Sequence, residues 1–343
     1  QEEFFHTFNT LYEAKKQMEA SRKEKGRYLI GVGMACGSHG TSMFPFMPDI
    51  TGITIKMNED GTIVFTTGTS DMGNGSVTTQ CMLISEVLGI PLDHIAYIKT
   101  DTDAAMSDLG AYASRGTYTS GHAAVKTAQI MRDKIAVLAA ELLDTTTDNL
   151  DFHDDAVWCV DIHRKFVSMK EIAVHAREKH QEDLSCSYMF HSEAGPMSSG
   201  AHFAKVQVDT VTGGIKVLEY AAVHDVGRVV NPMGITGQLE GGISMGLGYA
   251  LCEEMKLDST GRNQTSSFKK YHILNVKEMP KLSVDFLDSE EETGPYGAKS
   301  IGECAVVPVA PAIANAVSNA VGRQFYKLPI RPEDVLEALS LVK

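Results

Sequence analysis

A lone glutamate, Glu303, ends a segment of mostly small residues, GPYGAKSIGE at 294–303, and the apolar segment CAVVPVAPAIANAV follows it. A carboxylate in such surroundings suits general acid/base catalysis near neutral pH. The same position also suits a glutamate that stabilises the start of a helix through the helix dipole. Composition alone leaves these two interpretations equal.

Three further segments combine glycine with polar side chains: Gly73-Asn74-Gly75, Ser114-Arg115-Gly116-Thr117 and Gly237-Gln238-Leu239-Glu240-Gly241-Gly242. Glycine lets backbone N–H groups approach a ligand closely, and a helix start adds positive potential for a phosphate. Each segment stands before or at the start of an expected helix, so a capping turn is the simpler interpretation of any single one. Three together, two of them with an amide side chain, favour loops that converge on a polar, phosphorylated ligand.

Two other glycine motifs carry weaker predictions. In GVGMACG (31–37) the third glycine falls one residue too late for a dinucleotide-binding fingerprint, and no clear βαβ unit follows. GISMG (242–246) matches the nucleophile elbow of serine hydrolases, which requires a strand before the serine. The flanks of Ser244 instead have helical patterning, and His272 is the only histidine after it. Chance is favoured for both motifs, and a serine hydrolase based on Ser244 is kept as an alternative.

Composition excludes several classes of protein. The chain has 343 residues and a net charge of −13, which argues against nucleic acid as a partner. The cysteines form no C-x-x-C pair, so no iron–sulfur or zinc site is predicted, and their scatter fits a reducing compartment. We find no apolar run of about 18 residues and no charged-then-apolar leader. A cytoplasmic protein with no membrane contact is therefore expected.

Hydrophobic periodicity predicts a mixture of strands and helices. An amphipathic helix is expected over 2–25, and Asp60-Gly61 predicts a hairpin between two β-branched runs. The helix after residue 75 is expected to end at Gly89. Strands are predicted at 28–36, 50–57, 62–70, 94–100 and in a pair across 201–227, and helices at 76–90, 122–143, 235–255, 311–322 and 332–343. Their irregular alternation favours an α+β fold.

Five segments in this order and spacing resemble the molybdenum hydroxylases of the xanthine dehydrogenase/aldehyde oxidase family: DMGNGSVTTQ (71–80), ASRGT (113–117), AHFAKVQVDTVTG (201–213), HDVGRVVNPMGITGQLEGGISMGLGYAL (224–251) and GPYGAKSIGE (294–303). The resemblance covers roughly residues 28–340 and is specific because the last two runs occur together. It implies a two-lobed α+β molybdopterin-binding fold. The expected ranges are an N-terminal helix at 1–27, a first lobe at 28–175, and a second lobe at 176–343 that carries Glu303.

The resemblance also implies the chemistry. It predicts hydroxylation of an N-heterocycle, purine-like above all, or of an aldehyde, with oxygen taken from water and Glu303 as the catalytic base. The molybdenum would be held by the pterin dithiolene and by no protein side chain. The cofactor implied is molybdopterin, with its cytosine dinucleotide form as one candidate. Cofactor-binding residues by match of position are Gly73, Asn74, Gly75, Ser114, Arg115, Gly116, Thr117, Gln238, Ala298, Lys299 and Ser300.

The partners implied are the family's N-terminal molybdopterin-binding half, an iron–sulfur subunit and a flavin subunit with FAD. None of their motifs occurs in this sequence. The chain departs from the family at Asn74, where the pattern has glutamine beside the metal's oxo group. A non-catalytic assembly subunit that retains the fold is therefore a second alternative.

Overall fold

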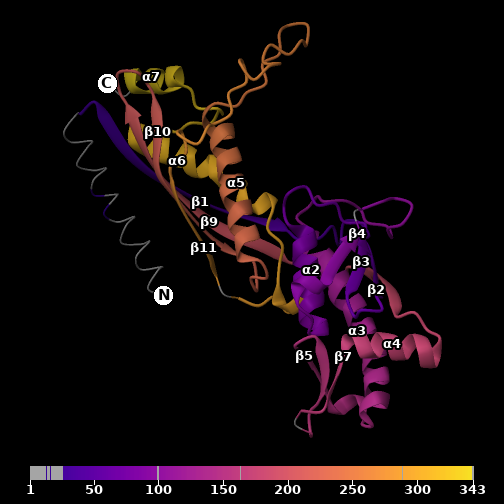
Figure 1. The fold of residues 1–343 in the computed structure, drawn as a ribbon. Helices are drawn as coiled ribbons and strands as arrows, with labels where there is room; N and C mark the ends of the chain where they lie inside the picture. Colours follow the sequence, from indigo (N-terminus) through magenta and orange to yellow (C-terminus); the bar gives the residue numbers. More distant parts are fainter. Residues whose placement is uncertain are drawn as a thin grey trace.

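The computed structural model describes residues 26–341 except 99, 163 and 288, together with Glu13 and Lys16. The helix predicted over 2–25 therefore lies almost wholly outside the described residues. Two lobes lie end to end, and each has its own sheet and its own hydrophobic core (Figure 1). The mixture of helices with mainly antiparallel sheets confirms the predicted α+β class.

The first lobe is built on a four-stranded sheet in the order β4-β3-β2-β8, with β3 and β4 parallel and the other pairs antiparallel. Its strands are β2 (Ile50–Met57), β3 (Ile63–Thr67), β4 (Ile95–Ile98) and β8 (Ser185–His191). Two helices, α2 (Ser76–Leu88) and α3 (Gly121–Leu143), share the core of this sheet. A three-stranded sheet and a further helix complete the lobe: β5 (Leu150–His153), β6 (Ala156–Cys159), β7 (Phe166–Ser168) and α4 (Met169–His180).

Local sequence signals explain the boundaries of these elements. Gly61 has a φ of 89° in the turn between β2 and β3, a backbone conformation that glycine adopts without strain. Gly89 closes α2 with a φ of 66°, and its N–H donates to the carbonyl of Ser85. Both turns confirm the sequence predictions. Ser168 and Glu171 form a reciprocal capping box at the start of α4.

The second lobe contains a sheet in the order β1-β9-β10-β11, and helices pack against it to form the second core. Its strands are β1 (Tyr28–Gly40), β9 (Met197–Asp209), β10 (Ile215–Asp225) and β11 (Lys281–Leu287). Its helices are α5 (Pro232–Leu251), α6 (Val309–Val321) and α7 (Pro332–Leu341). Strand β11, which pairs in parallel with β10, was not predicted from the sequence.

The glycines of the GVGMACG segment have a packing role. Gly31 and Gly33 lie on β1, and a Cβ atom at Gly33 would overlap the backbone of Ala312 and Ala316 on α6. Helix α6 therefore approaches β1 at Gly33 more closely than any side chain at that position would allow. The structure thus gives these glycines a packing role in place of the dinucleotide-binding role that their spacing already disfavoured.

The two lobes are interleaved along the chain. Strand β1 lies in the sheet of the second lobe, whereas β8 lies in the sheet of the first. The predicted ranges 28–175 and 176–343 therefore do not follow the two sheets, because pairing between distant strands places β1 with the second lobe and β8 with the first. Among the described residues, one segment, Glu303–Val321, is long and apolar enough to cross a membrane, and 67% of its most apolar window is buried inside the protein. This segment contains α6, whose Ala312 and Val317 are fully buried core residues.

Candidate active site

A cleft of about 540 Å³ lies where the two lobes meet. Its walls come from the start of α2, the π-helical turn η2 (Gly116–Ser120) that leads into α3, the first half of α5, and the segment before α6. Most of the predicted site residues line it: Gly73, Asn74, Ser114, Arg115, Gly116, Thr117, Gln238, Lys299, Ser300 and Glu303. The other two flank the cleft, since Gly75 precedes α2 and Ala298 is fully buried beside Gly227.

Glycines leave the backbone open toward the cleft. No heavy atom lies within 4 Å of the position that a Cβ atom would take at Gly73, Gly116, Gly237 or Gly241. The first N–H groups of η2 also have no acceptor within their own helix. These positions form a cradle that can receive a flat, polar group against bare backbone. The segment 237–242 lies inside α5, however, because that helix begins at Pro232, three residues before the predicted start at residue 235.

Asp71 holds the loop around Asn74 in place. Its carboxylate accepts the N–H groups of Gly73 at 2.8 Å, Gly75 at 3.3 Å and Val77 at 3.4 Å. The N–H groups of Gly73 and Gly75 are therefore engaged within the loop. In this conformation they are not available as hydrogen-bond donors to a cofactor. Sequence reasoning missed Asp71, although an aspartate two residues before a glycine is a common turn signal. Asn74 is half-buried and its side-chain oxygen accepts the N–H of Ser76 at 3.3 Å.

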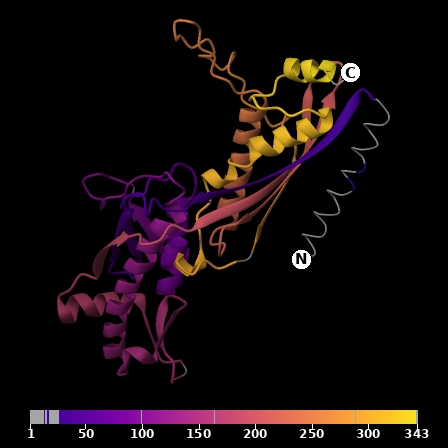
Figure 2. The same ribbon diagram turned by 180° about the vertical axis from the view of Figure 1, so that it is seen from behind.

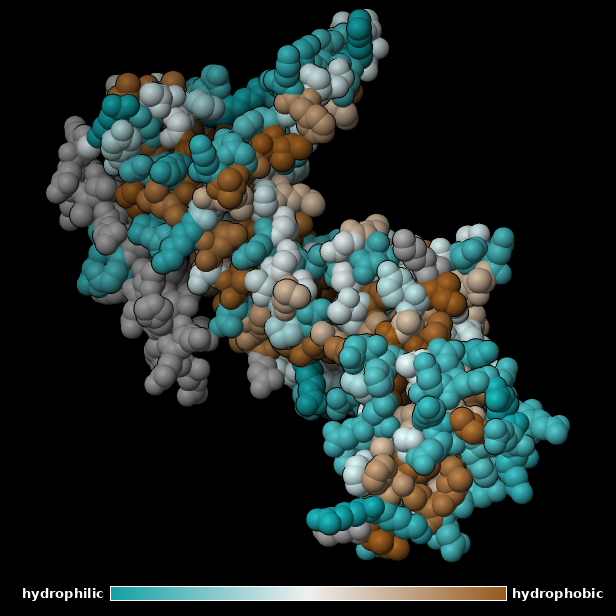
Figure 3. Space-filling model, viewed as in Figure 1, coloured by the Kyte–Doolittle hydropathy of each residue, from teal (hydrophilic) through white to brown (hydrophobic). Residues whose placement is uncertain are grey.

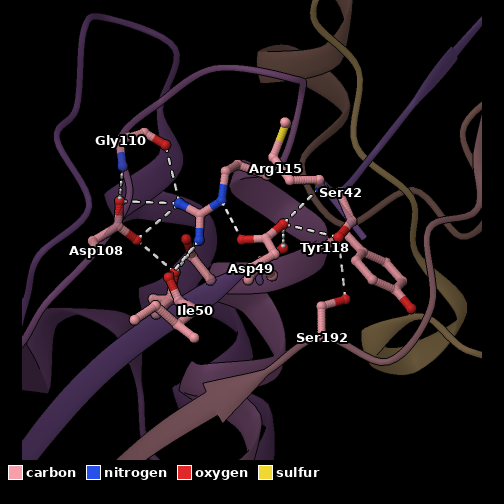
Figure 4. A network of polar contacts seen from close by, with 12 residues as sticks. Ser42, Asp49, Ile50, Asp108, Gly110, Arg115, Tyr118 and Ser192 are labelled. Atoms are coloured by element: carbon pink, nitrogen blue, oxygen red, sulfur yellow. Dashed lines mark hydrogen bonds and ion pairs between the residues drawn. The ribbon is translucent and has the colours of Figure 1, made fainter. Parts of the chain in front are cut away.

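The side chain of Arg115 belongs to a buried network (Figure 4). Its guanidinium donates to Asp49 at 2.6 Å, to both oxygens of Asp108 at 3.0 Å, and to the carbonyls of Ile50 and Gly110. These side chains are at most 1% exposed. Only the backbone of Arg115 is therefore left for a ligand, and its place among the cofactor-binding residues stays a prediction that concerns this backbone. Loss of one partner from such a buried pair typically costs about 3–5 kcal/mol of stability.

Lys299 is similarly occupied. Its ammonium group is 2.9 Å from a carboxylate oxygen of Asp225, and the lysine is 8% exposed. Burial alone would raise the pKa of Asp225, but hydrogen bonds from Ser289 and Lys299 outweigh burial and lower it. The Asp225 carboxylate thus stays ionised, and its contact with Lys299 fixes the segment that leads to Glu303.

Glu303 starts the short helix η5 (Glu303–Ala305), and its carboxylate is exposed to the cleft. The hydroxyl of Ser114 forms a hydrogen bond with this carboxylate and accepts the backbone N–H of Glu303 at 3.0 Å. Close by, the hydroxyl of Ser300 accepts the N–H of Tyr118 at 2.8 Å. Glu303 therefore starts a short helix and also faces the cleft, and its catalytic role stays a prediction.

Arg228 is a cleft residue that the sequence prediction did not include. It is exposed, lines the cleft and forms no ion pair with any residue that the structure describes. Arg115 and Lys299, the other cations of the lining, are already paired. Arg228 is therefore the available positive charge for an anionic ligand. Its signal was present in the DVGR run quoted for the family resemblance.

Ser244 does not form a nucleophile elbow. It lies in the middle of α5, with a turn or more of helix on either side, and it is not among the residues that line the cleft. The elbow motif needs a strand followed by a sharp turn. The serine-hydrolase alternative is therefore wrong.

The sequence model of one family, the molybdopterin cofactor-binding domain, matches residues 9–280. This chain belongs to that family. A xanthine dehydrogenase molybdenum-binding subunit from Escherichia coli O157:H7 is 31% identical over 336 residues, with 96% of this chain and 45% of the relative covered. The carbon monoxide dehydrogenase large chain of Afipia carboxidovorans is 29% identical over 90% of this chain and 39% of its own.

The fold agrees with the family. A solved structure of reconstituted CO dehydrogenase from Oligotropha carboxidovorans superposes with a TM-score of 0.91 and 26% identity, covering 99% of this chain and 44% of the other. The chain thus spans less than half the length of these relatives. The residues of the cleft fit molybdopterin, a polar and phosphorylated ring system. Arg228 has no ion-pair partner among the described residues, Gln238 lines the cleft with an amide that can donate and accept, and Gly116 leaves the backbone uncovered.

Proposed function

We propose that this chain forms one side of the active site of a molybdenum hydroxylase of the xanthine dehydrogenase type. The substrate class is an N-heterocycle, purine-like above all, or an aldehyde, and the oxygen comes from water. The observation that carries the proposal is the meeting of Glu303 with three glycine-containing segments in one cleft of a molybdopterin-binding family member.

The residues of the chain have separate tasks in this proposal. Arg228 and the backbone of Gly116 and Thr117 would bind the phosphate and pterin, with Gln238 as a further donor and acceptor. A bound molybdenum–pterin group would accept two electrons from the substrate and activate the water-derived oxygen. Glu303 would accept the proton that this oxygen loses, and Ser114 would hold the carboxylate in position. General bases of this kind typically contribute about 10²–10⁴-fold to the rate.

We propose that the N-terminal molybdopterin-binding half of the family forms the opposite wall of the cleft. Exposed apolar side chains on α5 suit such a contact, namely Met233 (84% exposed), Met245 (62%) and Tyr249 (60%). Apolar surface is visible on the face that carries α5 in Figure 3. An arm over residues 252–280 also protrudes from the second lobe and exposes Phe268 and Val276 (Figures 1 and 2).

We further propose that iron–sulfur and flavin partners receive the electrons, and that the assembly works in the cytoplasm. Names of the relatives indicate subunits of larger enzymes, as in a molybdenum-binding subunit and a large chain. The six cysteines are all free and lie far apart in the sequence, so the described part of the chain offers no set of thiolate ligands for an iron–sulfur cluster. The electrons would therefore leave through other chains or domains.

Co-purification of this chain with its complementary half tests the proposal. We expect about one molybdenum and one pterin per complex, and Arg228→Ala should lower the retained pterin about tenfold, as removal of a charged hydrogen bond typically does. Arg323→Ala, at an exposed arginine just after α6 that does not line the cleft, is the matched control and should retain full pterin content. A folded complex without molybdenum or pterin would instead support the non-catalytic assembly subunit, which Asn74 leaves open.

A further inference from the structure

Three potential metal ligands meet at the end of the first lobe, remote from the cleft. Glu141 lies in the last turn of α3, and His175 and His180 lie on α4. The Nε2 atom of His180 is 2.8 Å from the carboxylate oxygen Oε2 of Glu141, and the Nε2 atom of His175 is 3.4 Å from the same oxygen. The two imidazole rings are edge to face, with centroids 5.3 Å apart. All three side chains therefore converge on one point.

The geometry suits a small divalent transition-metal ion. The ligand atoms of the three residues lie within 4.8 Å of one another. Zinc bonds of about 2.0–2.2 Å to imidazole nitrogen and carboxylate oxygen place tetrahedral ligands roughly 3.3 Å apart. Small rotamer adjustments convert the present spacing into that one. Two histidines and one glutamate are also a ligand set that zinc uses in proteins when a further position is left for water.

The hydrogen bonding of His175 adds a reason to expect a ligand. Its Nε2 atom is buried and forms no well-aligned hydrogen bond in the described part of the chain, because the Glu141 carboxylate is 3.4 Å away, and the side chain as a whole is 19% exposed. A buried polar atom without a partner is costly, and such atoms commonly mark an ion or water site. Helix ends add to the effect, because Glu141 and His180 each lie in a last turn, where the helix dipole favours a cation.

We propose that Glu141, His175 and His180 bind a divalent transition metal, with Zn²⁺ as the expected ion. The ion would join the C-terminal turns of α3 and α4. Glu141 lies 20 residues along α3 from Gly121, which corresponds to about 30 Å. Because α3 starts beside the cleft, the metal site is too distant to take part in the chemistry there. Its role is a structural clamp that fixes α4 on the end of α3 (Figure 1).

Metal titration of the full chain, after removal of bound metals, tests this proposal. Zn²⁺ affinity and stoichiometry are measured for the native chain and for Glu141→Gln, His175→Ala and His180→Ala, with circular dichroism to verify folding. His272→Ala is the matched control, because His272 is an exposed histidine that pairs with Glu278 at 2.9 Å and has no third potential ligand beside it among the described residues. Co²⁺ is used in parallel as a probe of ligand type, and Mg²⁺ as an ion that imidazole does not favour.

We expect one Zn²⁺ per chain in the native protein and in His272→Ala, with little binding of Mg²⁺. Each ligand variant should bind at least about 100-fold more weakly, the upper end of the loss seen when only a supporting partner is removed. Zn²⁺ should also raise the melting temperature of the native chain and not of the ligand variants. Native-like binding by all three ligand variants would overturn the proposal. So would a Co²⁺ spectrum with thiolate bands, because the six free cysteines would then hold the ion.

Discussion

The hydroxyl of Ser114 holds both ends of Glu303, since it bonds to the carboxylate and accepts the backbone N–H, across 189 residues of sequence. Ser114 has a left-handed φ of 47°, which is uncommon for a residue other than glycine. A Cβ atom at residue 302 would lie 2.8 Å from this hydroxyl, so the glycine found there makes the contact possible. A loop of the first lobe thus orients the carboxylate that the second lobe supplies.

Ser114→Ala removes both contacts without adding bulk. A hydrogen bond to a charged group is worth about 1.5–3 kcal/mol, so kcat/KM of the assembled enzyme should fall by roughly 10–100-fold. Molybdenum and pterin content should stay within error, because the loss is one of carboxylate orientation. Ser187→Ala, an exposed serine on β8, is the control for removing a hydroxyl and should leave kcat/KM unchanged. Native kinetics in fully loaded Ser114→Ala would show that Glu303 needs no positioning.

Gly33→Ala tests the packing of β1 against α6. The added methyl group would overlap the backbone of Ala312 and Ala316, where neither strand nor helix can yield without moving the core. Overpacking of this kind typically costs about 1–3 kcal/mol in free energy of unfolding, and more against rigid backbone. Gly40→Ala, near the end of the same strand, is the control because its nearest neighbour would be 3.6 Å away. Chemical denaturation of both variants measures the difference, and equal midpoints would refute the packing role.

Two buried histidines predict sensitivity to acid. His202 and His224 are fully buried, and their Nε2 atoms are 2.6 Å apart. Burial, and then the neighbouring His224, lowers the pKa of His202 to about 3, and burial lowers the pKa of His224 to about 4. The unfolded chain therefore binds these protons first as the pH falls. This contribution to stability is complete above about pH 6.5 and is lost progressively as the pH drops toward 4.

Denaturation across this range should show the effect directly. Each imidazole contributes up to about 1.4 kcal/mol per pH unit to the fall in unfolding free energy. The double variant His202→Gln, His224→Gln cannot titrate, so its stability should depend less steeply on pH whatever its absolute value. If the imidazole resonances assigned to His202 or His224 titrated near pH 6.5 in the folded protein, they would contradict the account, since they would show that this pair is not held neutral.

Much of the fold could be predicted because local signals and tertiary packing agree. The alternation of β2 and β3 around Gly61, and the periodicity of α2 up to Gly89, match the observed elements closely. Strand β11 was missed because KLSVDFL is short and its pairing with β10 is fixed by distant contacts. For the same reason the sequence could not show that β1 pairs with β9.

The sequence predicted which residues belong to the site better than it predicted what each of their side chains contacts. Composition and the family resemblance brought Glu303 and the glycine segments together, and the structure places them around one cleft. The direction of a side chain is decided by tertiary contacts, so the sequence did not reveal that Arg115 turns into the network of Asp49 and Asp108. Arg228 was overlooked because one arginine in a loop has no periodicity or partner spacing that marks it as a ligand contact. The DVGR run was used only to support the family resemblance.

The most direct test of the central claim is the turnover of Glu303→Gln in the assembled enzyme. Glutamine keeps the size of the side chain and can still bond to Ser114, but it cannot accept a proton at neutral pH. We expect full molybdenum and pterin content, an unchanged melting temperature and a loss in kcat of about 10²–10⁴-fold. A helix-start role alone would instead cost about 0.3–1 kcal/mol of stability and leave turnover nearly intact. Near-native turnover at full cofactor loading would contradict Glu303 as the catalytic base.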